Sequence, residues 1–96
     1  MTTIDLLRTK RDDVLAIAQK HGVTSIKVFG SVARGEESAE SDVDLLVTTG
    51  PEVSSWFPAG LILDLEHLLG RRVDIVTEAG VNSHIRDEVL SEAVAL

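Results

Sequence analysis

Residues 24–49 read TSIKVFGSVARGEESAESDVDLLVTT and contain two short runs that favour β-strands. The first run, 24–29, is rich in β-branched residues and stops at a glycine, and the second, 42–49, stops at a Gly-Pro turn. Residues 31–41 between them are polar, and they are expected to form a loop with one helical turn. Because this connection is too short for a full helical crossover, the strands are expected to belong to a mixed sheet.

Helical periodicity lies on either side of this stretch. Residues 2–21 are expected to form one long helix that ends at Gly22, because apolar residues recur there at helical spacing. A second helix is expected to end at Gly70, a third strand to cover 72–77, and a last helix to begin at residue 82 or 83. This order predicts a small α/β (α+β) domain in which helices cover one face of a three-stranded mixed sheet. The whole chain, 1–96, is expected to be that single domain.

The composition limits the classes of function. The 96 residues carry a formal net charge of −7, 44% of them are hydrophobic and none is cysteine. Disulfides and thiolate metal sites are therefore excluded, and the lack of cysteine fits a cytoplasmic protein. So acidic a chain lacks the charge of a general nucleic-acid binder. Its apolar stretches are far shorter than a membrane span.

Three aspartates are expected to share one face of the sheet. Side chains alternate along a strand, so Asp42, Asp44 and Asp74 point away from the aliphatic residues that would meet the helices. Adjacent strands lie about 4.8 Å apart, which puts the three carboxylates within reach of one cation. The alternative makes Asp42 a turn cap, Asp44 an exposed strand residue and Asp74 a solvated partner of a neighbouring arginine. Because aspartate is a poor strand former, its use at all three positions favours the shared site.

A glycine-serine bend precedes the aspartates. Gly30 would let the backbone come close to a ligand, and the amides and hydroxyl around Ser31 could donate hydrogen bonds to an anion. Arg34 could contact the same phosphates, although a plain surface arginine explains it equally well. A Gly-Ser pair alone is a weak indication, but beside Asp42 and Asp44 it supplies anion donors opposite a carboxylate-held metal, as a nucleoside triphosphate requires.

Several other residues have structural or open interpretations. His21 and His67 are expected to be ordinary helix-end residues, and Arg71 and Arg72 to have structural roles near a helix end. Two interpretations stay open for Lys27: it faces the cleft, or it lines an edge of the sheet. The sequence does not decide whether the adjacent aromatic residues 56 and 57 form a hydrophobic staple or an exposed patch for a partner.

The string GSVARGEESAESDVDLLV, residues 30–47, resembles the Gly-Ser…Asp-x-Asp motif of the DNA-polymerase-beta-type nucleotidyltransferase superfamily. It is most similar to the minimal nucleotidyltransferases. The resemblance extends to the RVDIV run at 72–76 and to the closing segment 85–93, and it covers the chain from about residue 4 to the end.

The resemblance implies a catalytic palm that transfers nucleotides. Asp42 and Asp44 would bind two Mg²⁺ ions, and Asp74 would be a further metal ligand or the base that deprotonates the attacking hydroxyl. Gly30 and Ser31 would hold the triphosphate of ATP, with Arg34 beside them. Paired metal ions stabilise the attacking and leaving oxygens of such an in-line displacement.

Minimal nucleotidyltransferases of this kind are encoded with small helical HEPN proteins, so the resemblance also implies a partner. The chain would be the antitoxin that transfers AMP to a tyrosine of a HEPN toxin, in a hetero-oligomer or as a homo-oligomer. One alternative is a non-catalytic antitoxin that neutralises the toxin by binding. The other is transfer to a small molecule of the aminoglycoside type, in a pocket that dimerisation would build.

Overall fold

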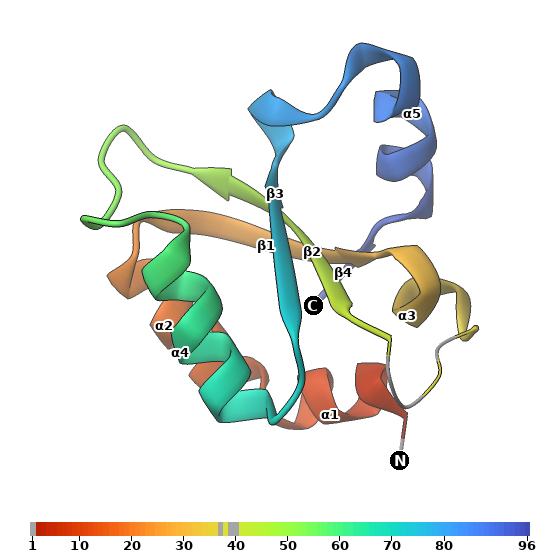
Figure 1. Cartoon of the computed structure of the whole chain (residues 1–96), viewed down its shortest axis with the longest axis horizontal. Helices are drawn as coiled ribbons and strands as arrows, with labels where there is room; N and C mark the ends of the chain where they lie inside the picture. Colours follow the sequence, from red (N-terminus) through yellow and green to blue (C-terminus); the bar gives the residue numbers. More distant parts are fainter. Residues whose placement is uncertain (1, 37, 39–40) are drawn as a thin grey trace.

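A four-stranded mixed sheet forms the centre of the protein (Figure 1), in the computed structural model, which describes residues 2–36, 38 and 41–96. The strand order is β3-β2-β1-β4; β1 runs antiparallel to β2 and β4, and β2 runs parallel to β3. The mixed sheet is therefore confirmed. The strands are β1 (Val23–Phe29), β2 (Val43–Thr49), β3 (Val73–Thr77) and β4 (Val94–Ala95).

The prediction of three strands was wrong by one. The additional strand β4 pairs with only two residues of β1, Lys27 and Val28, and so completes the sheet at its outer edge. A two-residue strand carries no alternation of polar and apolar residues, and its formation depends on β1, more than sixty residues earlier in the chain.

Within the described residues, five α-helices and a short 3₁₀ helix accompany the sheet. Figure 1 shows α2 and α4 side by side against one face of the sheet, with α1 across its lower end. The helices are α1 (Thr3–Thr9), α2 (Arg11–Lys20), α3 (Gly30–Arg34), α4 (Ala59–Leu69), the 3₁₀ helix η1 (Glu78–Gly80) and α5 (Ser83–Glu92). The helical turn expected in the first connection is α3, while part of the rest of 31–41 lies outside the described residues.

The expected single helix over 2–21 is two helices with a break at Lys10. This residue ends α1 and begins α2, with φ −99° and ψ 17°. A straight helix of this length would extend for about 30 Å. The break instead directs α1 across the end of the domain, where Thr3 and Leu7 are buried.

The hydrophobic core fills the space between the sheet and α1, α2 and α4. Val43, Leu45 and Val47 are fully buried, as their parity on β2 predicts. Leu46 is buried as well, although it points to the opposite face. It stands in register between Lys27 and Val76 on the neighbouring strands.

The last helix differs most from expectation. α5 ends at Glu92, none of its residues is buried, and Ile85 is 49% exposed, so this helix does not pack into the core beneath the sheet as expected of the helical layer. Figure 1 shows α5 standing apart from the layer of α2 and α4. Among the described residues, two ion pairs attach it, one between Arg34 and Glu92 and one between Arg86 and Glu78.

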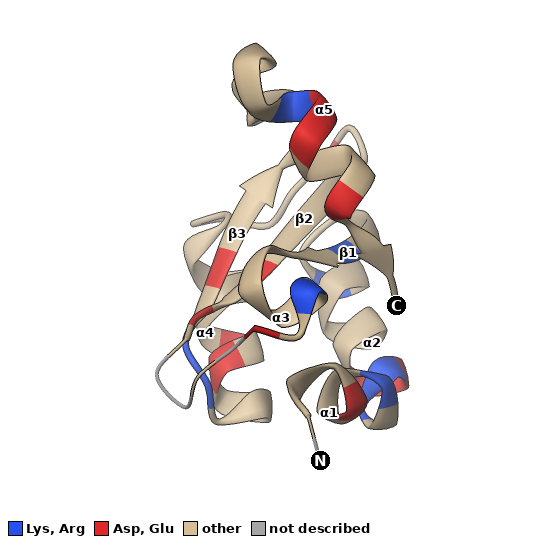
Figure 2. Ribbon diagram, turned by 90° about the vertical axis from the view of Figure 1, so that its right-hand side faces the viewer, with Lys and Arg blue, Asp and Glu red and all other residues tan. Residues whose placement is uncertain are grey.

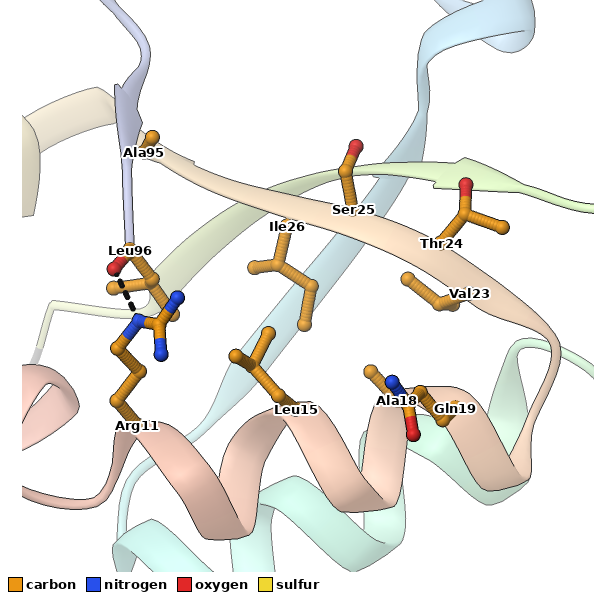
Figure 3. Close-up of a pocket in the computed structure, with 10 residues that line it drawn as sticks. All are labelled: Arg11, Leu15, Ala18, Gln19, Val23, Thr24, Ser25, Ile26, Ala95 and Leu96. Carbon is orange, nitrogen blue, oxygen red and sulfur yellow. Dashed lines mark hydrogen bonds between the residues drawn. The ribbon is translucent and has the colours of Figure 1, made fainter.

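A cavity of about 290 Å³ lies between α2 and the edge of β1. Figure 3 shows Leu15 and Ala18 of α2 on one side of it and Ile26 of β1 on the other, with Arg11 at one end, where the Arg11 Nε donates to the Leu96 carbonyl at 2.7 Å. The cavity opens on the helical side of the sheet.

Within the described part of the chain, no helix combines the length and apolar character that crossing a membrane requires.

Candidate functional site

Asp44 of β2 and Asp74 of β3 stand side by side. The parallel register pairs these two residues directly, and the residues before them, Val43 and Val73, are buried on the helical side. Both aspartates therefore point to the other face, as the parity predicts. Figure 2 shows the acidic segments of β2 and β3 next to α3. Asp44 is half-buried and Asp74 is exposed.

The electrostatics of this pair disfavour two negative charges. Burial raises the pKa of the Asp44 carboxyl above its ordinary value, and the nearby charges of Asp74 and then Asp42 raise it further. Arg34 acts on the same pKa in the opposite direction, which places its charge within reach of Asp44. A cation bound between the carboxylates would relieve this repulsion.

Gly30 lies directly against the Asp44 carboxylate. β1 ends at Phe29, which is paired with Asp44, and Gly30 then turns the chain with φ +73° into α3. A Cβ at Gly30 would collide with Oδ2 of Asp44. Both the positive φ and the close approach require glycine here. Ser31 follows as the second residue of α3, half-exposed on the same bend.

Asp42 is turned toward Arg72. Its Oδ1 lies 3.2 Å from the Nε of Arg72, and both side chains are largely exposed. Across residues 2–36, 38 and 41–96, no three His, Cys, Asp or Glu side chains are arranged so that they could hold a metal ion. The backbone thus brings the three aspartates to one face of the sheet, while the side chain of Asp42 pairs with a cation of the protein itself.

The donor set nevertheless has the right chemistry for Mg²⁺. Carboxylate oxygens are the ligands that Mg²⁺ uses in proteins, commonly one or two of them together with phosphate oxygens of the substrate. Asp44 and Asp74 provide two such groups in register, and the missing side chain at Gly30 leaves room for the Asp44 carboxylate. The metal-ligand roles of Asp42, Asp44 and Asp74 remain predictions.

Arg34 and Lys27 lie around the aspartates. The Arg34 guanidinium pairs with Glu36 at 3.0 Å and with Glu92 of α5, and these two hydrogen bonds raise its pKa. Contact with a triphosphate would compete with these carboxylates. Lys27 points to the same face as Asp44, because it is in register with Leu46, two residues along β2.

Arg71 behaves as the structural interpretation expects. Its guanidinium donates to the Thr3 hydroxyl at 2.6 Å and to the carbonyls of Ser41 at 2.8 Å and Ser38 at 3.4 Å. These bonds join α1 to the segment that leads into β2. Arg71 thereby positions the backbone just before Asp42.

His21 has a more definite role than the sequence indicates. It is buried, with Nδ1 2.5 Å from the Ser54 hydroxyl and Nε2 2.7 Å from Oδ2 of Asp64. The hydrogen bond from His21, helped by Lys20, lowers the pKa of Asp64. Ser54 and Asp64 are 33 and 43 residues away in sequence, so no local pattern identifies them. The network lies at the start of β1, a strand length of about 23 Å from Gly30, and is therefore separate from the aspartates.

The two adjacent aromatic residues have different environments. Trp56 is 86% exposed, whereas Phe57 packs against the hydrophobic core. Only Phe57 therefore contributes to the apolar anchoring of α4, and Trp56 belongs to the surface.

Comparisons with known proteins show the family to which the chain belongs. The family model described as "Nucleotidyltransferase domain" matches residues 11–96. The chain is 38% identical over 81 residues to "Putative protein adenylyltransferase MJ0435" of Methanocaldococcus jannaschii, covering 84% of this chain and 87% of the relative. It is 42% identical over 78 residues to "Protein adenylyltransferase MntA" of Thermococcus cleftensis, covering 81% and 79% of the two chains.

Solved structures share the fold. The "Structure of putative minimal nucleotidyltransferase" superposes with a TM-score of 0.86 at 46% identity, covering 100% of this chain and 97% of that one. A toxin–antitoxin structure with AMP-PNP, at 19% identity and a TM-score of 0.73, covers 88% of this chain and 69% of that one. The toxin–antitoxin MntA-HepT structure, at 16% identity and a TM-score of 0.66, covers 91% and 68%. These last two likenesses concern the fold alone. The chain belongs to the nucleotidyltransferase domain family, and within it is related to the minimal nucleotidyltransferases.

Proposed function

We propose that this nucleotidyltransferase transfers AMP from ATP to a hydroxyl group of a partner protein, and that the acceptor is a tyrosine of a HEPN toxin. The observation that carries the proposal is the register of Asp44 with Asp74 beside the Gly30 bend. The relatives named protein adenylyltransferases support the type of acceptor. The fold shared with the antitoxin of the MntA-HepT structure supports the kind of partner.

The reaction breaks one bond and forms one. The acceptor oxygen attacks the α-phosphorus of ATP, the bond from that phosphorus to the bridging oxygen breaks, and pyrophosphate leaves. Asp74, the exposed carboxylate of the pair, would act either as the base that accepts the proton of the attacking hydroxyl or as a further metal ligand. Gly30 and Ser31 would hold the triphosphate through the backbone and the hydroxyl of the bend, with Arg34 beside them.

Asp42, Asp44 and Asp74 would hold Mg²⁺ in this site. When bound, Mg²⁺ would neutralise part of the triphosphate charge and stabilise the attacking and leaving oxygens. The protein would supply position and electrostatics, since phosphoryl chemistry needs little covalent participation by side chains. The pKa of Asp44 is raised first by burial and then by the charges of Asp74 and Asp42, and the same cation would offset this repulsion.

The direct test uses ATP labelled at the α-phosphate, Mg²⁺ and a purified HEPN protein as the candidate acceptor. We expect label to move to the partner, and mass spectrometry to find added AMP on a tyrosine. Asp42→Asn with Asp44→Asn should reduce transfer at least about a thousand-fold, the scale of losing charge stabilisation in the transition state. Omitting Mg²⁺ should have a similar effect.

The controls separate the alternatives. Glu52→Gln removes one exposed carboxylate far from the site and should transfer label as well as the wild type. If the folded double variant labels the partner at the wild-type rate, the enzymatic proposal is wrong. If it still neutralises the toxin in cells without transfer, the chain is an antitoxin that acts by binding. Label on an aminoglycoside and none on protein would indicate small-molecule transfer by a homodimer.

We further propose that the protein acts in the cytoplasm, as one domain spanning 1–96.

A further inference from the structure

Arg72 is aimed at the site, whereas the neighbouring Arg71 is not. The two arginines precede β3, and alternation along the strand sends them to different surroundings. Arg71 is held by Thr3, Ser38 and Ser41 on the segment before β2. Arg72 shares its parity with Asp74 and lies on the face that carries the aspartates.

The contact of Arg72 is with one of these aspartates. Val43 and Val73 pair in register, and the residues one step before them, Asp42 and Arg72, form the ion pair at 3.2 Å. The Val43 amide also donates to the Arg72 carbonyl at 2.8 Å, which fixes the backbone on both sides of the pair. In the described part of the chain, Asp42 is the side-chain partner that Arg72 has.

The ion pair between Arg72 and Asp42 can be replaced by another ion. The Arg72 side chain is 76% exposed and that of Asp42 is 49% exposed, so both are solvated and neither needs the other to remain folded. Exposed ion pairs are weak and screened by salt. A divalent cation approaching the carboxylate face would compete directly with the guanidinium for the Asp42 oxygens.

We propose that Arg72 is a positioning residue that acts through Asp42: it is the counter-ion of Asp42 while the metal is absent, and it gives way when a divalent cation binds. Arg72 thereby lowers the affinity of the bare site for divalent cations. This inference rests on the proposed function, because it assumes that Asp42 is a metal ligand.

The test measures binding of Mn²⁺ alone, without nucleotide, by electron paramagnetic resonance on the full chain. Arg72→Ala should bind Mn²⁺ roughly five-fold more tightly than the wild type, the effect of removing a unit charge about 4 Å from the ligand in water. Arg72→Lys keeps the charge and should lie within about two-fold of the wild type. The gain in Arg72→Ala should shrink toward nothing in about 1 M salt.

Two controls tie the effect to Asp42. Arg86→Ala removes the same charge from another exposed arginine-carboxylate pair, that with Glu78, and should leave Mn²⁺ affinity unchanged. In an Asp42→Asn background, Arg72→Ala should no longer increase the affinity, since the two residues are coupled. An Arg72→Ala affinity that is unchanged or weaker, with the wild type binding Mn²⁺, overturns this inference alone. Absence of Mn²⁺ binding in both proteins overturns the metal site of the proposed function as well.

Discussion

At the scale of single residues, Gly30 joins the backbone to the chemistry of the site. Its φ of +73° turns the chain out of β1, and its missing side chain leaves room for the Asp44 carboxylate. Gly35, five residues later, has nearly the same φ, +72°, but nothing lies within 4 Å of the position of its Cβ. Substitutions at the two glycines can therefore be compared: both positions have a left-handed backbone, but only Gly30 also lies close to the Asp44 carboxylate.

We expect Gly35→Ala to reduce the free energy of unfolding by about 1–2 kcal/mol, the cost of a left-handed alanine. Gly30→Ala should cost about 1–3 kcal/mol more, because the added methyl group displaces Asp44. Urea denaturation measures both differences, and label transfer should be lost only in Gly30→Ala. Equal destabilisation of the two variants, with equal activity, would mean that the contact with Asp44 is unimportant.

The buried His21 is a second residue with a specific prediction. It bridges the Ser54 hydroxyl and the Asp64 carboxylate, and so ties the end of α2 to the loop before α4 and to α4 itself. His21→Ala should lower the free energy of unfolding by about 2–3 kcal/mol, because both partners lose a partly buried hydrogen bond. Ser54→Ala should cost about 1 kcal/mol.

Thermal and urea denaturation measure these losses. Because the His21 network lies a strand length from Gly30, nucleotide binding by the folded variants should equal that of the wild type. Gln19→Ala on the same helix changes an exposed residue outside the network and serves as the control. A folded His21→Ala protein that fails to bind nucleotide would connect the network to the site after all.

At the scale of elements, the pairing of β2 with β3 places the like charges of Asp44 and Asp74 next to each other. The pKa of Asp44 is raised above its ordinary 3.8. Between the ordinary pKa of 3.8 and the raised pKa of Asp44 in the folded protein, the folded protein binds more protons than the unfolded chain. Stability therefore falls as the pH rises through that range. Above it, charged Asp44 destabilises the fold relative to a neutral side chain.

Asp44→Asn should therefore stabilise the protein near pH 7, by up to about 1 kcal/mol, the size of a like-charge contact between neighbouring strands. The gain should disappear below pH 3.8, where Asp44 is protonated in both states. Urea denaturation across pH 3–8 measures it, with Glu52→Gln as the control for the net charge. A gain that is constant across this range would show that charge at Asp44 is not its cause.

The sequence predicts those elements whose pattern is local. Strand parity correctly places Asp44 and Asp74 on the face away from the core, because alternation needs only the residues of each strand. It could not predict β4 or the burial of Leu46, since both depend on register with distant strands. For the same reason the His21 network and the Asp42–Arg72 pair were missed: each partner is chosen by tertiary packing.

At the scale of the whole molecule, stability is distributed unevenly. β2 lies inside the sheet and contributes several fully buried residues, whereas α5 buries none of its own. α5 is attached through two ion pairs of the described residues, Glu92 with Arg34 and Arg86 with Glu78, in which both arginines are exposed and both glutamates are partly buried. Regions with few buried contacts open at lower free energy than the core.

We therefore expect the amide hydrogens of α5 to exchange much faster than those of β2 in native-state hydrogen exchange. Glu92→Gln should speed exchange in α5 further, by up to about five-fold at low salt, because an exposed ion pair contributes at most about 1 kcal/mol. Glu88→Gln, an exposed carboxylate on the same helix without an ion pair in the described residues, should have no such effect. Protection in β2 should stay the same in both variants, since the core does not depend on α5. Equal protection in α5 and β2 would instead mean that the helix unfolds only with the whole domain, and that its two ion pairs are not what holds it.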